Sequence, residues 1–293
     1  MKKVGGRMNN NKKEKTGLVV CLFPEQYEIF DHRLNKPVCH QKYENGRLTG
    51  SMLIQDIDEV SIKGKMIQYF SPNNIGLLLS ISLLHVKNSE KIFIDTIKNI
   101  DFQENRNKKE ALNSVSSIIC NYIEEIQIAI VFGYTALETF ANLSIPEDYE
   151  YKKKNETKGI HELYEKGSIE RWLSLKEKIQ YILTDIYKTD KTDRQKWWGH
   201  FSNLEQLRND IIHQKTVKNT EFYKDYFKEK IFEICKCPKE VIRFFYSAHE
   251  KNNQTNPIWP WIEGENNIFP INTKYDTQRF EVIGNIHDGL KKK

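Results

Sequence analysis

The sequence predicts a mainly α protein, a helical bundle preceded by a β-containing module. The stretch Ala111–Asn142 keeps helical periodicity without a proline, and residues 169–187 and 195–213 repeat apolar side chains at the spacing of an amphipathic helix. Residues 46–70 alternate apolar and polar side chains, as a strand does. We therefore expect a flexible leader over residues 1–16, a β-rich module over 17–104, a helical domain over 107–252 and an irregular tail over 253–293.

The expected N-terminal module opens with Leu18–Phe23, an apolar run typical of a buried strand. After residues 46–70, the sequence Ser71-Pro72-Asn73-Asn74 offers helix-start residues ahead of the apolar run Ile75–Val86. A buried strand would give the same run, so helix and strand both remain open there. The polar segment Asn105–Lys109 is the predicted linker to the helical domain.

The helical domain is expected to hold four helices. Pro146 ends the first, because proline lacks an amide proton and disfavours helix in the residue before it, and a basic loop runs on to Gly159. Ser168 is the predicted N-cap of the next helix, which carries Trp172 on its apolar stripe. The remaining predicted elements are a break at Lys188–Arg194, a helix over Gln195–His213, and a helix over Thr220–Lys251 that is broken or kinked at Pro238. A non-helical segment follows from Pro257 to Trp261. We favour the interpretation that this segment covers the domain, and the alternative is that it docks a partner.

Composition indicates a soluble cytoplasmic protein. The 293 residues are 39% hydrophobic, and the 45 basic and 40 acidic residues are interspersed, which leaves a net charge of +5. No apolar run approaches the ~20 residues of a membrane span. The five cysteines form no paired framework, and neither a zinc-binding spacing nor a Gly-rich phosphate loop is present, so we expect reduced thiols, no metal and no cofactor.

The most informative feature is the run Arg208-Asn209-Asp210-Ile211-Ile212-His213. Arginine can donate two parallel hydrogen bonds to a phosphate, and histidine exchanges protons near neutral pH. RNA carries its own nucleophile, the ribose 2′-hydroxyl, so these two side chains could support cleavage without a metal. The same spacing occurs at Arg33/His40, Arg194/His200 and Arg243/His249, but only Arg208 is followed by Asn and flanked by apolar residues at helical spacing.

Arg208, Asn209 and His213 resemble the Arg-x4–6-His motif of the HEPN superfamily, whose members are helical bundles and often metal-independent endoribonucleases. The segment Ile128–Asn142 looks like the long early helix of these domains, and Glu138 within it is the candidate support of the site. The resemblance covers residues ~107–252. It implies catalytic roles for Arg208, Asn209, His213 and Glu138, and a bacterial toxin or anti-phage effector restrained by an antitoxin or triggered within a defence system.

Residues five apart on a helix lie about 140° apart around its axis, so Arg208 and His213 do not share a face. The resemblance implies a homodimer in which a second copy of the helix completes the cleft. Cations near the motif and one aromatic residue are candidate contacts to RNA, or else solvated surface: Lys152, Lys153, Lys154, Arg194, Lys196 and Trp198.

Two alternatives remain open. The helical domain could bind RNA or dimerise as a sensor without cutting, or the N-terminal module could carry an activity of its own.

Overall fold

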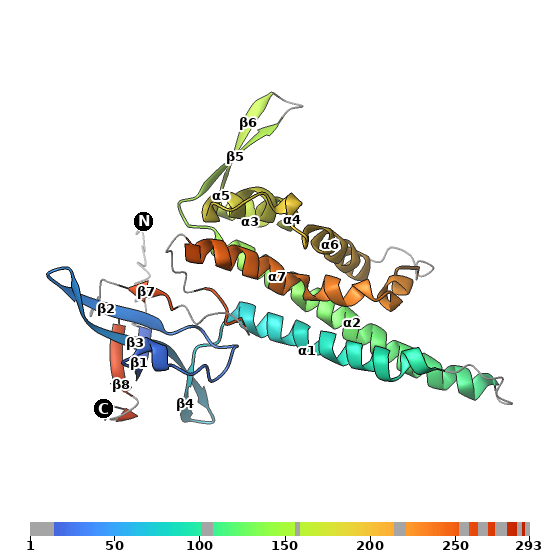
Figure 1. Cartoon of the computed structure of the whole chain (residues 1–293), viewed down its shortest axis with the longest axis horizontal. Coiled ribbons are helices and arrows are strands. Elements are labelled where there is room, and N and C mark those ends of the chain that lie inside the picture. Colours follow the sequence, from blue (N-terminus) through green and yellow to red (C-terminus); the bar gives the residue numbers. More distant parts are fainter. Residues whose placement is uncertain are drawn as a thin grey trace, which may run out of the picture.

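We analysed a computed structural model of the chain. It describes residues 15–100, 108–155, 159–213, 221–251, 258–262, 269–272, 280–285 and 289–290. A β-sheet unit lies at one end, and a layer of long helices extends away from it (Figure 1). The protein is therefore mainly α with a smaller β part, as the sequence predicts.

The sheet has seven strands in the order β7-β2-β3-β1-β8-β9, with β4 paired to β3. Two tight turns join its consecutive N-terminal strands, one at Asn45–Gly46 and one at Lys63–Gly64. All four of these residues have positive φ, which is the conformation of the two-residue hairpin turn that matches strand twist. The strands are β1 (Lys15–Cys21), β2 (Val38–Glu44), β3 (Arg47–Ile62), β4 (Lys65–Phe70), β7 (Ile271–Asn272), β8 (Phe280–Asn285) and β9 (Gly289–Leu290).

The C-terminal region corrects the prediction of an irregular tail over 253–293. β8 pairs in parallel with β1, and β7 pairs in parallel with β2, so the two ends of the chain share one sheet. Parallel pairing between strands so far apart in sequence leaves no local signal. The predicted leader over 1–16 falls mostly outside the described residues, although Lys15 and Thr16 already belong to β1.

The run left open between helix and strand is helical. α1 (Asn74–Asp95) starts at Asn73, whose side chain accepts a hydrogen bond from the Gly76 amide at 2.9 Å. α1 packs along α2 (Lys108–Ser144) as a long hairpin (Figure 1). The boundary between the β part and the helices therefore lies near residue 73 rather than at 104–107, and most of the predicted linker falls outside the described residues.

The second half of the bundle is more broken than its periodicity predicts. The segment over 169–187 is not one helix, because it is interrupted at Leu173 and includes a π-helical turn, η3 (Lys178–Ile182). Its elements are α3 (Lys166–Trp172), α4 (Leu175–Glu177), η3 and α5 (Leu183–Tyr187), followed by the 3-10 turn η4 (Thr192–Arg194).

Ser174, not Ser168, is the cap in this segment. Its hydroxyl accepts from the Glu177 amide, and the Glu177 carboxylate accepts from the Ser174 amide, which is a capping box. Leu173 is extended and ends α3 just before this cap, so the helical spacing does not continue past Trp172. Trp172 is 67% exposed instead of lying in the core as its spacing predicts.

The last two predicted helices are present with altered bounds. α6 (Trp198–Ile212) begins three residues late, and the final segment splits into η5 (Glu221–Phe227) and α7 (Lys230–Lys251), with α7 continuing through Pro238. The basic loop before Gly159 is instead a hairpin of β5 (Glu150–Asn155) and β6 (Ile160–Glu165) that projects from the bundle (Figure 1). Shorter 3-10 turns are η1 (Pro24–Gln26) and η2 (Ile97–Asn99).

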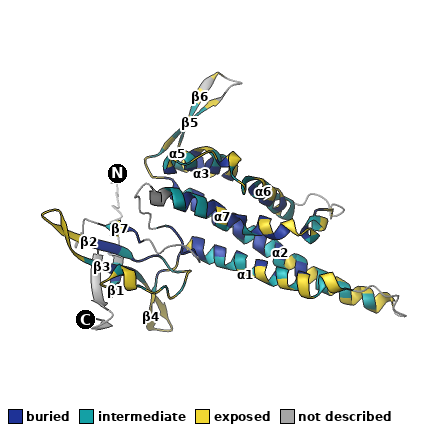
Figure 2. Cartoon of the chain, in the orientation of Figure 1, coloured by how far each residue is buried: buried dark blue, intermediate teal, exposed yellow. Residues whose placement is uncertain are grey.

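The main core lies where α1, α2, α6 and α7 meet. Burial is deepest near the sheet and decreases toward the far ends of α1 and α2 (Figure 2). Trp259 belongs to this core, with its ring centroid 5.0 Å from that of Phe140, while Trp261 packs in the sheet's own cluster. The tryptophans of the C-terminal segment thus cover the domain, as the favoured reading predicts.

Within the described part of the chain, α2 is long and apolar enough to cross a membrane by length and composition. The 18-residue window that meets these criteria is 22% buried, and the buried positions of α2 between Tyr122 and Ala141 face the other helices of the bundle. That packing is compatible with a soluble protein.

Candidate functional site

The motif predicted from the sequence lies at the C-terminal half of α6. Phe201, Leu204 and Leu207 anchor α6 in the core, which places Arg208 and Asn209 half-buried at its edge. His213 is the C-cap: its amide donates to the Asn209 carbonyl at 2.9 Å, and its side chain is exposed. With φ −115° and ψ 32°, His213 has already left the helical conformation, so the 140° separation of an ideal helix does not fix its direction.

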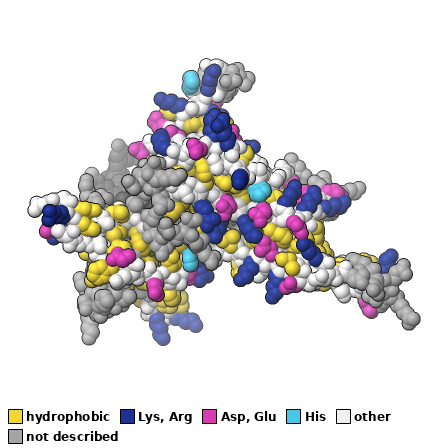
Figure 3. All heavy atoms as spheres, in the orientation of Figure 1, with side chains coloured by type: hydrophobic (Ala, Val, Ile, Leu, Met, Phe, Trp, Pro, Cys, Tyr) yellow, Lys and Arg dark blue, Asp and Glu magenta, His cyan; other side chains and the backbone are white. Residues whose placement is uncertain are grey.

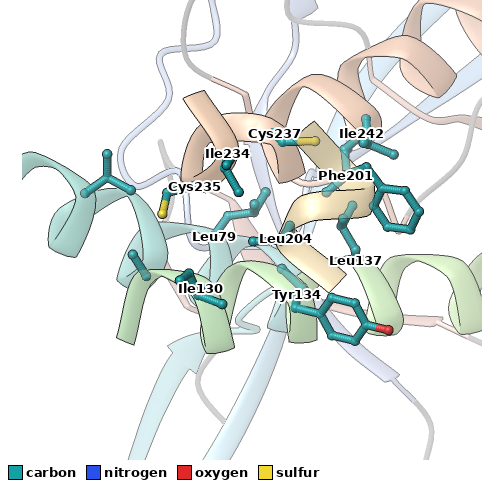
Figure 4. Packing of buried hydrophobic residues seen from close by; sticks show 14 of the residues in the cluster. Leu79, Ile130, Tyr134, Leu137, Phe201, Leu204, Ile234, Cys235, Cys237 and Ile242 are labelled. Atoms are coloured by element: carbon teal, nitrogen blue, oxygen red, sulfur yellow. The ribbon is translucent and has the colours of Figure 1, made fainter. Parts of the chain in front are cut away.

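Arg208 is held by two neighbours. Its guanidinium carbon lies 5.0 Å from the centroid of the Tyr134 ring on α2, and Nη1 donates to Asn209 Oδ1 at 3.2 Å. Tyr134 sits at the edge of the core cluster with its hydroxyl directed outward (Figure 4). That hydroxyl donates to Glu205 Oε1 at 3.4 Å, which is a long hydrogen bond.

Burial and nearby carboxylates keep the hydroxyl of Tyr134 protonated. Burial of the side chain raises the pKa of Tyr134, the carboxylates of Glu205 and Glu138 raise it further, and the Arg208 cation opposes them. Tyr134 can therefore donate a hydrogen bond at neutral pH, but it cannot act as a base there.

Glu138 lies one turn after Tyr134 on α2 and is half-buried. Its charge acts on Tyr134 and on Lys178. Within the described residues no hydrogen bond or ion pair joins Glu138 to Arg208 or to His213. The structure therefore brings Arg208, Asn209 and Glu138 to one face around Tyr134, and leaves His213 at the open end of α6.

Lys178 is a buried cation that the sequence did not single out. It is 5% exposed, and its Nζ donates to Asn142 Oδ1 at 2.9 Å and to the Glu170 carbonyl at 3.0 Å. Burial lowers the pKa of Lys178, and the charges of Glu138 and Glu170 oppose that shift. Tyr134, Glu138 and Asn142 follow one another at four-residue intervals, so α2 carries a polar stripe from Arg208 to Lys178.

Among the residues missed, Tyr134 and Glu205 had a weak signal in the sequence. Tyr134 precedes Glu138 by four residues and Glu205 precedes Arg208 by three, the spacings that share a helix face. Lys178 had none, because its partners lie on other helices: Asn142 on α2 is 36 positions earlier, and the Glu170 carbonyl on α3 is 8 positions earlier.

The predicted RNA contacts lie in separate places. Lys152, Lys153 and Lys154 are on β5, and Lys153 forms an ion pair with Glu177. Arg194 and Lys196 are exposed ahead of α6. Cations and acids are mixed over the face seen in Figure 3 and do not form one continuous basic surface there.

Trp198 serves mainly in packing. It is half-buried, its ring centroid lies 5.4 Å from that of Phe201, and the Lys176 ammonium lies 5.7 Å from its centroid. These contacts occupy part of the ring and limit its stacking with a base.

Neither a metal cluster nor a disulfide is found in the part of the chain that the structure describes. No group of three or more His, Cys, Asp and Glu side chains converges there, and all five cysteines are free thiols. Cys235 and Cys237 are buried, and burial raises the pKa of the Cys235 thiol to about 12, so it is unreactive at neutral pH.

The chain matches a known protein family. The model of the YopA C-terminal domain family matches residues 85–242, which run from α1 to α7 and include every candidate site residue. No curated protein and no solved structure matches the chain. Because the match spans more than half of its 293 residues, this chain belongs to the YopA C-terminal domain family.

Proposed function

We propose that this protein is a metal-independent endoribonuclease of HEPN type that acts in the cytoplasm as a toxin or anti-phage effector. The observation that carries the proposal is the end of α6, where a half-buried guanidinium is held by Tyr134 and an exposed imidazole follows within the next turn and a half. The first can stabilise charge on a phosphate, and the second can exchange a proton with solvent or substrate.

In the proposed reaction, His213 removes the proton of a ribose 2′-hydroxyl, and the resulting oxygen attacks the adjacent phosphorus. The bond from phosphorus to the 5′-oxygen breaks, and that oxygen takes a proton from an acid, leaving a 2′,3′-cyclic phosphate and a 5′-hydroxyl. Arg208 stabilises the charge on the phosphorane, Asn209 orients Arg208, and Glu138 supports the arrangement through Tyr134.

One histidine cannot be base and acid in the same step. A homodimer that brings a second His213 to the cleft would supply the acid. The HEPN resemblance implies such a dimer, in which the second copy of the helix completes the cleft. Lys152, Lys154, Arg194 and Lys196, which are exposed, are the proposed contacts to the RNA backbone, with Lys153 and Trp198 more restricted by their own contacts.

A non-catalytic RNA-binding or dimerisation module is the second candidate. The observation in its favour is that Arg208 already has two intramolecular contacts, to Tyr134 and Asn209, which would suit a fixed anion-binding cation as well as a catalytic one.

Incubation of the full-length protein with RNA in EDTA distinguishes the nuclease from the non-catalytic RNA-binding module. The nuclease predicts cleavage that falls by about 100-fold or more in His213→Ala, the usual scale for loss of a general base. His32→Ala, which alters an exposed histidine between η1 and β2 and away from the proposed RNA contacts, is the matched control and should cleave normally. RNA binding that needs Arg208 without any cleavage supports the binder, and absence of both overturns both.

A further inference from the structure

A cavity of about 420 Å³ opens between the segment that follows α5 and the second half of α7. Its volume falls within the range of small-molecule sites. It is separate from the Arg208 site, since Trp197 in its wall precedes α6 and Arg208 lies about 15 Å further along that helix at 1.5 Å per residue. The residues that matter for its chemistry are Lys188, Asp190, Trp197, Glu240, Arg243 and Phe244.

One wall is aromatic. The ring centroids of Trp197 and Phe244 lie 5.5 Å apart with their planes at 64°, so Phe244 supports the indole from the side. Trp197 is half-buried, which leaves part of its surface facing the cavity. A supported indole at a cavity wall is a platform on which a planar ring can stack.

Two cationic residues, Lys188 and Arg243, line the same space. Arg243 is held by Glu240, with Nη1 3.1 Å from Oε1, which fixes the guanidinium near the cavity. Lys188 is the residue after α5 and adopts a left-handed conformation with φ 49°. Glycine adopts that conformation without cost, so a lysine here retains backbone strain. Its Nζ donates to Asp185 Oδ1 at 2.8 Å, and both side chains of this ion pair are exposed, so a phosphate would replace Asp185 as the partner of the ammonium.

The charges limit the ligand. Asp190 and Glu240 share the lining with Lys188 and Arg243, and Asp185 pairs with Lys188 from beside it, so the acids around the cavity outnumber its cations. A ligand with several negative charges would be repelled by the acids, whereas a single phosphate can meet the cations. The acids can accept hydrogen bonds from base or ribose groups that donate.

From this combination we infer that the cavity binds a nucleoside monophosphate unit, with the base on Trp197 and the phosphate at Lys188 and Arg243. The unit could be a free nucleotide or one residue of an RNA strand. Binding at this site does not depend on whether Arg208 and His213 cleave RNA.

Calorimetric titration of the full-length protein with GMP, UMP and ribose 5-phosphate tests the inference. At least one nucleotide should bind, and ribose 5-phosphate should bind about tenfold more weakly because it cannot stack on Trp197. Arg243→Gln should weaken nucleotide binding by a similar factor.

Lys188→Gly should also weaken binding, and it should raise the melting temperature because it relieves strain. Lys63→Gly is the matched control: Lys63 also has φ 49° but lies in the turn between β3 and β4. It should raise the melting temperature and leave binding unchanged.

A 2′-O-methyl hexanucleotide, which lacks the nucleophilic hydroxyl, distinguishes the two sources of the ligand. Its binding, weakened by Lys188→Gly, assigns the site to an RNA strand, and binding of mononucleotides alone assigns it to a free nucleotide. Absence of binding by all probes at millimolar concentration, or binding unaffected by both Arg243→Gln and Lys188→Gly, overturns the inference. Because no cleavage is measured, neither result can be mistaken for success or failure of the proposed nuclease.

Discussion

The guanidinium of Arg208 lies over the ring of Tyr134, 5.0 Å from its centroid, and this contact joins α6 to α2. The ring is 5% exposed and belongs to the core, so it cannot move without disturbing the packing around it. The position of the motif arginine is therefore set by the core of the bundle. The exposed His213 has no comparable support from the described residues and depends on the end of α6.

Tyr134→Phe should be tolerated and Tyr134→Leu should not. Phenylalanine keeps the ring under Arg208 and loses only the long hydrogen bond to Glu205, at a cost of about 1 kcal/mol or less. Leucine removes the cation–π contact and leaves space in the core, and should cost about 2 kcal/mol or more. Urea denaturation measures both. Equal losses in the two variants would show that the ring does not hold Arg208.

RNA cleavage should follow the same order. We expect Tyr134→Phe to keep the rate within about threefold and Tyr134→Leu to lower it by about tenfold, because a displaced guanidinium stabilises the phosphorane less. The assay should be run where both variants are folded, as judged by circular dichroism.

Lys178 should make stability depend on pH in the alkaline range. Its pKa is lowered in the folded protein, so the unfolded chain binds more protons between the folded pKa and the ordinary lysine value of about 10.4. The free energy of unfolding contributed by this group therefore rises with pH across that window. Lys178→Met should remove the rise, as measured by urea denaturation from pH 7 to pH 10.5. Lys191→Met, at an exposed lysine, is the control and should keep it.

Gly133→Ala should separate the helices around the core. A Cβ at Gly133 would lie 2.9 Å from Pro238 Cγ on α7 and 2.9 Å from Ser82 Oγ on α1. Both neighbours are constrained, since Pro238 is a ring inside a helix and Ser82 donates to the Ala129 carbonyl. We expect a loss of about 1–3 kcal/mol. Gly199→Ala, where a Cβ meets nothing within 4 Å, should be neutral or stabilising by up to about 1 kcal/mol. Similar losses in the free energy of unfolding for Gly133→Ala and Gly199→Ala would contradict the close packing of α2 against α1 and α7 at Gly133.

The serine that caps the broken helix can be identified by two alanine substitutions. Ser174→Ala removes the capping box and should lower the free energy of unfolding by about 1 kcal/mol. Ser168→Ala should change it by less than about 0.5 kcal/mol, because Ser168 lies inside α3. A larger loss of stability in Ser168→Ala than in Ser174→Ala, by thermal or urea denaturation, would instead identify Ser168 as the helix cap, as the sequence predicts.

The helices were predictable because their apolar residues recur along one local segment. α2 and α6 therefore appeared close to their predicted bounds. Two kinds of feature were not predictable. The strands β7 and β8 depend on pairing with residues more than 200 positions earlier, and the interruption after Trp172 depends on a cap that periodicity does not register.

The part of the candidate site that lies within one segment was predictable, and the part contributed by other elements was not. Arg208, Asn209 and His213 are local in sequence, so their place at the end of α6 followed from the pattern. The ring beneath Arg208 and the buried ammonium of Lys178 come from other elements, and no single stretch of sequence relates them to the motif.

The most direct test of the proposed chemistry is the identity of the RNA ends. After incubation with the full-length protein in EDTA, mass spectrometry of the products should show a 2′,3′-cyclic phosphate and a 5′-hydroxyl, and a substrate with 2′-deoxyribose at the cut should stay intact. Products with a 5′-phosphate, or cleavage that persists at the 2′-deoxy position or in His213→Ala, would contradict the account.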